Sequence, residues 1–265
     1  MLTRLLTALV GLPLLLVVVW LGEIWFSALV ALAAVLSSVE LTSMIRRWGQ
    51  PIPVLLVSVP AFALIAAAHM LSRQAAPPLA ITLAVAAPSV GLLVWLVVNR
   101  GRQMAIARPL TTLAIILYAG GFLFHAPLLR ALEQGREWVL FLFLVTFATD
   151  TSAYFVGKFV GKTPLAPAIS PSKTREGAMG GIIGAIGASL AANYVLGLDA
   201  LVWEALLLGG MIGVVAQAGD LAESRIKRLS GVKDSGTIIP GHGGILDRLD
   251  SIVLNLLVVY YFVSW

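Results

Sequence analysis

Long apolar stretches separated by short polar turns run along this chain of 265 residues. A helix needs roughly 20 predominantly apolar residues to cross a hydrocarbon core of about 30 Å. Several stretches are long enough, and none shows the alternation of a membrane β-barrel strand. The pattern therefore predicts an all-α, polytopic integral membrane protein with about nine transmembrane helices. The expected spans are residues 5–21, 24–39, 52–71, 79–98, 109–129, 137–157, 178–197, 201–217 and 251–265.

The basic residues give these spans an orientation. With the N-terminus in the cytoplasm, 15 of the 18 Lys and Arg residues fall on the inner side, and only Arg73, Arg130 and Arg136 fall outside. Cytoplasmic loops of membrane proteins carry such an excess of positive charge. We therefore expect a multi-pass protein of the cell (inner) membrane, with the polar loops 158–177 and 218–250 both facing the cytoplasm.

Composition agrees with this class and narrows the chemistry. Apolar residues make up 59% of the chain and the mean hydropathy is +0.96, whereas soluble proteins average about 45–50% apolar residues. The absence of cysteine excludes disulfides, thiolate catalysis and thiolate-bound metals. The isoelectric point of about 9.8 follows from a positive inner surface that faces anionic lipids, so nucleic acid is not an expected partner.

Polar groups gather in the second half of the chain. Residues 1–130 are almost pure apolar helix and are expected to serve as a scaffold or for dimer contacts, whereas residues 131–265 are expected to carry the active site. Acids, bases and glycines are most concentrated in residues 224–250, although the chain is only 12% charged. A polar segment of this kind at the bilayer surface indicates a charged ligand.

Two carboxylates flank this polar segment. Asp220 follows the eighth expected span and Asp247 precedes the ninth, so the two can meet at the cytoplasmic boundary although they are 27 positions apart. Paired carboxylates there would bind a hard cation such as Mg²⁺. The alternative is structural: Asp220 begins a surface helix over 220–229, in which Glu223 and Lys227 pair at i,i+4.

A third carboxylate, Asp150, lies inside the sixth expected span, about seven residues and roughly 10 Å from its cytoplasmic end. An ionisable side chain at that depth usually faces a polar cavity or a partner. We expect a functional role, and pairing with a buried Lys or Arg is the structural alternative.

Two further segments could bind phosphate. Loop 158–177 carries hydroxyls and cations just before an expected helix, including Ser170, Ser172 and Lys173, which is typical of a phosphate cradle. The alternative is a basic turn that binds lipid headgroups. In residues 240–244, glycines let the backbone approach a ligand, and His242 could orient phosphate or move a proton.

Other glycines and histidines are expected to be structural. His69 and His125 lie in apolar spans. No P-loop or dinucleotide-binding glycine motif is found. Close helix packing is the favoured role of a glycine series in the seventh span and just before it: Gly177, Gly180, Gly181, Gly184 and Gly187.

Polar residues and glycines follow one another in a set order after position 223: Ser224, Lys227, Arg228, Lys233, Asp234, Gly236, Pro240, His242, Gly243, Gly244, Asp247, Arg248 and Asp250. This series resembles the signature of the phosphatidate cytidylyltransferases, also called CDP-diacylglycerol synthases. Segments 149–157 and 170–174 look like upstream motifs of the same family, with Arg175 as a departure. The resemblance covers roughly residues 145–255, and the N-terminal half matches only in being hydrophobic.

The resemblance implies that a phosphatidate oxygen attacks the α-phosphorus of CTP, which yields CDP-diacylglycerol and pyrophosphate. That oxygen is already a nucleophile, so catalysis depends on positioning and charge neutralisation. A Mg²⁺ ion with Asp220 and Asp247 as ligands is implied, a second cation such as K⁺ is left open, and a homodimer is expected. The expected catalytic residues are Asp220, Lys227, His242 and Asp247. The expected substrate-binding residues are Asp150, Ser170, Ser172, Lys173, Arg228, Lys233, Asp234, Gly243, Gly244 and Arg248.

Two other classes compete with this reading. CDP-alcohol phosphotransferases and polyprenyl transferases use closely spaced aspartates, and this chain has no DDxxD cluster. A transporter would place Asp150 on an ion path, and its two halves would show repeat symmetry, which is not evident here.

Overall fold

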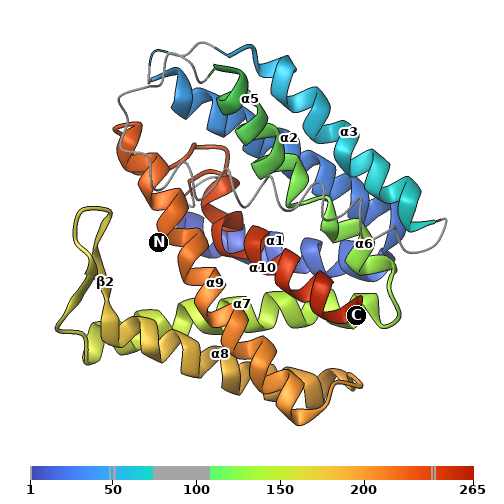
Figure 1. The fold of residues 1–265 in the computed structure, drawn as a ribbon, viewed down its shortest axis with the longest axis vertical. Coiled ribbons are helices and arrows are strands. Elements are labelled where there is room, and N and C mark those ends of the chain that lie inside the picture. Colours follow the sequence, from blue (N-terminus) through green and yellow to red (C-terminus); the bar gives the residue numbers. More distant parts are fainter. Residues whose placement is uncertain (1, 48, 50–51, 74–107, 240, 242) are drawn as a thin grey trace. The chain divides into compact units, whose positions relative to one another are not determined.

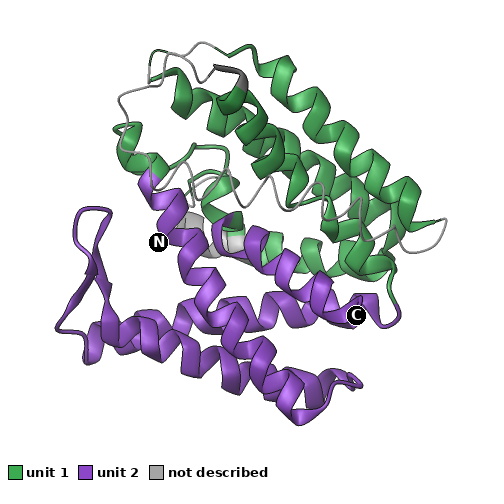
Figure 2. Cartoon of the chain, viewed as in Figure 1, with its two compact units in different colours: residues 1–132, 226–249 green, residues 133–225, 250–265 purple. Residues whose placement is uncertain are grey.

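A computed structural model describes residues 2–47, 49, 52–73, 108–239, 241 and 243–265. The described chain is almost entirely helical (Figure 1). It divides into two units, one of residues 1–132 with 226–249 and one of residues 133–225 with 250–265 (Figure 2). We call these unit 1 and unit 2.

Unit 1 contains the helices of the N-terminal half. They are α1 (Leu2–Leu21), α2 (Glu23–Arg46), α3 (Val54–Ser72), α5 (Arg108–Ile116), the π-helix η2 (Leu117–Gly121) and α6 (His125–Ala131). Met44, Ile65, Phe122 and Leu128 are among its fully buried side chains. Unit 1 also receives the end of α9 (Val202–Leu229), the start of α10 (Leu246–Val263) and the loop between them.

Unit 2 contains α7 (Gly135–Phe159), α8 (Arg175–Leu196), most of α9 and α10, and a small antiparallel hairpin. The hairpin strands are β1 (Pro164–Ala166) and β2 (Ser170–Thr174), with Pro164 opposite Thr174. Thr174 ends the hairpin and begins α8, because its hydroxyl accepts a hydrogen bond from the Gly177 amide at 3.1 Å.

The predicted glycine packing is confirmed at four of the five positions. A Cβ at Gly177 would lie 2.8 Å from the Ala153 carbonyl oxygen of α7, and one at Gly180 would lie 2.5 Å from the Val156 Cβ. Gly181 and Gly184 also face α7 closely, whereas Gly187 has no atom within 4 Å of such a Cβ. The missing side chains therefore let α7 and α8 approach along most of their contact.

Six helices are long and apolar enough to cross a membrane: 23–46, 54–72, 110–131, 135–159, 175–196 and 202–229. They correspond to six of the expected spans. Large apolar side chains such as Phe62, Phe155 and Ile183 are exposed on them, as lipid-facing side chains are. A helical, multi-pass membrane architecture is thus supported, while the count of nine and the orientation stay predictions.

The remaining expected spans differ from this set. The first corresponds to α1, a helix of 20 residues whose part Leu9–Leu21 is one of the shorter apolar helices. The ninth corresponds to α10, whose first turns carry Asp247, Arg248 and Asp250. The fourth, residues 79–98, lies outside the described residues.

Two local readings were wrong. The alternative of a separate surface helix over 220–229 fails, because these residues are the last part of one continuous helix, α9, and Glu223 is fully buried in it. Loop 158–177 contains the β1–β2 hairpin, which the all-α prediction lacked. The fifth span corresponds to residues 110–131, and within it η2 follows Ile116; a Cβ at Gly120 would lie 2.8 Å from the Ala61 Cα. This close contact with α3 accompanies the change in helix type.

Candidate functional site

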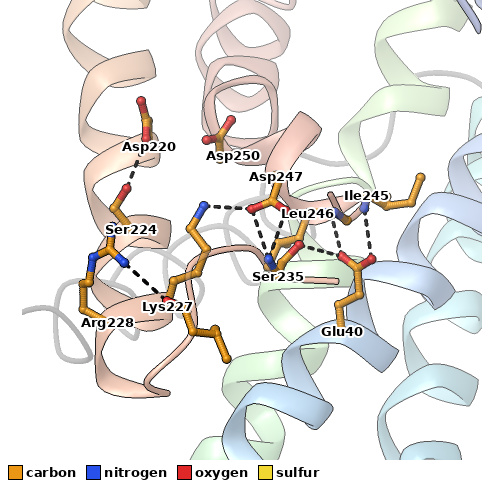
Figure 3. Close-up of polar contacts among 12 residues, drawn as sticks. Glu40, Asp220, Ser224, Lys227, Arg228, Ser235, Ile245, Leu246, Asp247 and Asp250 are labelled. Carbon is orange, nitrogen blue, oxygen red and sulfur yellow. Dashed lines mark hydrogen bonds and ion pairs between the residues drawn. The ribbon is translucent and has the colours of Figure 1, made fainter. Parts of the chain in front are cut away.

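Asp247, in the first turn of α10, is the centre of a polar cluster in unit 1 (Figure 3). Its side chain is only 6% exposed. Oδ1 accepts a hydrogen bond from Nζ of Lys227 at 2.8 Å. The Ser235 amide lies 3.2 Å from Oδ1 and 3.0 Å from Oδ2, and the Gly244 amide donates to Oδ2 at 2.8 Å. Three N–H donors from separate segments thus converge on one carboxylate.

These contacts keep Asp247 ionised. Burial disfavours the charged form and by itself would raise the pKa of Asp247. The hydrogen bond from Lys227, the Gly244 amide, the charge of Lys227 and the Ser235 amide outweigh burial, and the pKa falls below its ordinary value of 3.8. The cluster therefore holds a carboxylate anion and an ammonium together at neutral pH.

The loop before α10 folds back over Asp247. The Ile239 amide donates to the Gly243 carbonyl oxygen at 2.9 Å, which closes a tight turn. Gly243 has a φ of +83°, and a Cβ there would lie 2.5 Å from Oδ2 of Asp247. Glycine is therefore required at this position, both for the left-handed backbone and for the close approach.

A cavity of about 530 Å³ opens in this loop. Among its lining residues are Gly236, Thr237 and Gly243, together with the charged Asp234 and Arg248. Asp234 and Arg248 are exposed at its surface. The cavity thus combines glycine backbone with two charges of opposite sign, a lining able to receive a polar ligand.

Glu40 of α2 holds the same loop from the opposite side (Figure 3). The residue is 3% exposed. Its carboxylate accepts hydrogen bonds from the Ser235 hydroxyl at 3.0 Å, the Ile245 amide at 3.0 Å and the Leu246 amide at 2.9 Å. A side chain from the N-terminal half is therefore part of the structure that surrounds Asp247.

A second cluster lies in unit 2. Lys173 of β2 forms an ion pair with Oδ2 of Asp220 on α9. Oδ1 of Asp220 accepts from the Ser224 hydroxyl at 3.3 Å. The side chains of Lys173 and Asp220 are 26% and 31% exposed. This carboxylate is therefore more accessible than that of Asp247.

The hairpin that carries Lys173 is tied to the start of α8. The Glu176 carboxylate accepts hydrogen bonds from the backbone amides of Lys162 and Thr163, both at 3.1 Å to Oε2. The Thr174 hydroxyl caps the same helix end. These bonds fix the hairpin base and hence the position from which Lys173 reaches Asp220.

The other expected site residues are placed as follows. Asp150 is exposed on α7, and Ser172 is exposed on β2 with Ser170 half-buried beside it. Lys233 is exposed. Nη1 of Arg228, in the last turn of α9, donates to the Val232 carbonyl oxygen at 3.4 Å. His242 lies outside the described residues.

The expected metal ligands belong to different units, Asp220 to unit 2 and Asp247 to unit 1. Within the described part of the chain, no group of three or more His, Asp or Glu side chains is arranged to hold a metal ion. The sharing of one Mg²⁺ by Asp220 and Asp247 therefore stays a prediction.

Sequence reasoning missed Glu40 and Ser235. Ser235 stands in the recognised polar segment but is a small, common residue there. Glu40 had a usable signal, since it is a lone carboxylate next to the apolar run 24–39. Such a residue usually marks a polar partner. The partner could not be identified, because it lies 195 to 206 positions away.

The chain matches the model of the cytidylyltransferase family over residues 2–265. The match therefore extends well beyond residues 145–255, into the N-terminal half that contains Glu40. A phosphatidate cytidylyltransferase of Staphylococcus epidermidis is 46% identical over 132 residues, which are 48% of this chain and 51% of that protein. Phosphatidate cytidylyltransferases of Staphylococcus saprophyticus and Staphylococcus aureus are 43% identical over 150 residues, 54% of this chain and 56% of each relative. The chain thus spans about half the length of the curated relatives it matches.

Proposed function

The chain belongs to the cytidylyltransferase family, and on that premise we propose that it is a phosphatidate cytidylyltransferase of phospholipid biosynthesis. It would transfer CMP from CTP to phosphatidate in the membrane. A phosphate oxygen of the lipid forms a bond to the α-phosphorus of CTP. The bond from this phosphorus to the bridging oxygen of the β-phosphate breaks, and pyrophosphate leaves with the electron pair. The products are CDP-diacylglycerol and pyrophosphate.

One observation carries this proposal: the family's signature segment forms a closed polar loop around the buried Asp247 carboxylate. Lys227 and the amides of Ser235 and Gly244 all contact Asp247. Such a preorganised arrangement suits a reaction that depends on positioning and charge rather than on a strong base.

We assign the triphosphate of CTP to the cavity beside this loop. Arg248 lines it, and its guanidinium matches phosphate oxygens in geometry and charge. Thr237, also in the lining, carries a hydroxyl that can hydrogen-bond to phosphate oxygens. Asp234 also lines the cavity. Its negative charge would repel an anionic ligand that arrives without a cation.

The donor atoms at both clusters suit Mg²⁺, which prefers oxygen ligands and commonly keeps substrate phosphate in its shell. A carboxylate offers about four lone-pair directions. At Asp247 three N–H donors make four contacts, two on each oxygen, so a metal ion would have to displace one of them. Asp220 is more exposed and uses one oxygen for Lys173 and the other for Ser224. When bound, the ion would neutralise charge on the triphosphate. The proposal includes a second cation such as K⁺ in the same role.

The ion pair with Asp220 also bears on the proposed role of Lys173. A lysine already held by a carboxylate is oriented before substrate arrives. Incoming phosphate then competes with Asp220 for the same ammonium, unless Mg²⁺ takes over the carboxylate. We therefore propose that a metal ion and a substrate phosphate bind together at this cluster.

The purified protein in detergent or in lipid nanodiscs should convert labelled CTP and phosphatidate, with Mg²⁺, into a labelled lipid and pyrophosphate in equal amounts. Identification of the lipid as CDP-diacylglycerol by mass spectrometry completes the test. Absence of any CTP-dependent lipid product would refute the proposal. A CMP-releasing activity on added CDP-lipid would instead indicate a CDP-alcohol phosphotransferase.

A further inference from the structure

Glu40 lies at the point where α2 meets the loop and the start of α10, all within unit 1. Its Oε1 accepts from the Ile245 amide, and its Oε2 accepts from the Leu246 amide and the Ser235 hydroxyl. The first amides of a helix have no partner inside the helix. Glu40 therefore caps α10 from another helix, and the positive end of the α10 dipole favours its negative charge.

Two glycines make room for this carboxylate. A Cβ at Gly236 would lie 2.6 Å from Oε1 of Glu40, and a Cβ at Gly244 would collide with both Glu40 oxygens and with the Ser235 hydroxyl. Both glycines belong to the loop that surrounds Asp247. The loop backbone therefore packs directly against the Glu40 carboxylate. This contact is more extensive than a single capping hydrogen bond requires.

The contacts of Glu40 and Asp247 alternate along the same residues. Ser235 donates its hydroxyl to Glu40 and its amide to Asp247. Gly244 donates its amide to Asp247, and the next two amides donate to Glu40. The two carboxylates therefore hold the two ends of the loop together. Glu40 does so from α2, and Asp247 does so next to Lys227.

We infer that Glu40 is a positioning residue for CTP use: it fixes residues 235–239 and 243–246 of the loop, so that Asp247 and the cavity beside it keep their shape. This inference rests on the proposed function, because it assigns the loop to the nucleotide. Glu40 itself touches neither substrate. Its effect passes through Ser235, Gly244 and the first turn of α10.

The contact can be tested without any enzyme assay. Glu40→Gln keeps the size of the side chain but turns one acceptor into a donor that faces an N–H group. Hydrogen–deuterium exchange of the full-length protein in nanodiscs should show about tenfold or faster exchange at Ile245 and Leu246, because their acceptor is weakened. Glu23→Gln is the matched control, since Glu23 is exposed at the other end of α2. Unchanged protection in Glu40→Gln would overturn the inference.

Kinetics then separate positioning from simple stability. Glu40→Gln should lower kcat/KM for CTP by about tenfold to a hundredfold, well beyond any loss of folded protein, while the KM for phosphatidate stays close to that of Glu23→Gln. A loss of activity that only follows the loss of folded protein would overturn the inference, as would normal CTP kinetics. Should Glu40→Gln fail to fold, Ser235→Ala serves instead, because it removes the hydroxyl contact to Glu40 and keeps the amide contact to Asp247.

A double substitution tests the geometry directly. Gly236→Ala alone should impair CTP use, because its methyl group meets the Glu40 carboxylate. In a Glu40→Ala background that obstacle is gone, so Gly236→Ala should cause no further loss. If the double variant instead shows the full loss of Gly236→Ala added to that of Glu40→Ala, the inference is overturned. If the wild-type protein makes no CDP-diacylglycerol, the proposed function fails, and the exchange experiment still decides whether Glu40 holds the loop.

Discussion

The ammonium of Lys227 lies 2.8 Å from Oδ1 of Asp247, and the two side chains are 13% and 6% exposed. The pair joins the end of α9 to the start of α10, across a loop that separates them by 20 positions in the chain. Burying two charges costs desolvation free energy, so such a pair adds little by itself. Removing one partner is costly, however, because the other charge is left buried. Lys227 and Asp247 therefore hold the two helix ends in a fixed relation.

Lys227→Ala should lower the free energy of unfolding by about 2–3 kcal/mol, because Asp247 then keeps only its two amide donors. Activity should fall below detection. Chemical unfolding in detergent and the CTP assay measure the two effects. Arg225→Ala, two residues earlier on the same helix, is the control and should change neither by much. Wild-type stability in Lys227→Ala would show that the pair is not a structural link.

Asp220→Asn should separate catalysis from stability better than Asp247→Asn does. Asp220 is partly exposed and contacts side chains, so its loss should change stability by less than about 1 kcal/mol, while turnover falls at least about a hundredfold if it binds Mg²⁺. Asp247→Asn should lose turnover and also loosen the loop, because its amide group would face N–H donors. Asp199→Asn is the control, since Asp199 is exposed in the loop between α8 and α9. Near-normal turnover in Asp220→Asn would remove this residue from the metal site.

Chelation tests the metal independently of any substitution. EDTA should abolish turnover, and added Mg²⁺ should restore it, because the charge of the triphosphate must be neutralised. Readdition with and without K⁺ then shows whether a second cation contributes. Full activity in EDTA-treated, metal-free protein would exclude a divalent cation from the mechanism.

Gly180→Ala should destabilise the α7–α8 contact by about 1–3 kcal/mol, because its methyl group would overlap the β-branched side chain of Val156. Val156→Ala in the same protein should recover much of the loss. Gly187→Ala is a close control, since it lies on the same helix and has open space around it. That control should be neutral or slightly stabilising, because alanine favours helix more than glycine does. Equal effects of Gly180→Ala and Gly187→Ala would contradict the packing role. Thermal unfolding in one detergent compares all variants.

Much of this protein could be read from local patterns. Apolar length predicted six helices that the structure contains, with boundaries that mostly differ by a few residues. The spacing of Gly177, Gly180, Gly181 and Gly184 predicted a close helix contact correctly. The polar signature after Ser224 led to the family, which the match over the chain then supports. These features succeed because hydropathy, helix period and motif spacing are properties of neighbouring residues.

The errors arose where local patterns were ambiguous. The alternative reading of 220–229 as a separate surface helix fails, because α9 continues through these residues and buries Glu223. The hairpin in 158–177 lacks a hydrophobic alternation, and its base depends on the Glu176 carboxylate and the Thr174 cap. Such short strands are held by specific hydrogen bonds rather than by an apolar face.

Composition and motif order were enough to establish a helical membrane protein, its family and the polar segment around Asp247. Only the folded chain showed that Lys227 and two loop amides surround Asp247, and that Glu40 supports the same loop from α2. The physical reason is the buried carboxylate. It must find several donors to offset its desolvation, and those donors come from wherever the folded backbone brings them, here up to 206 positions away.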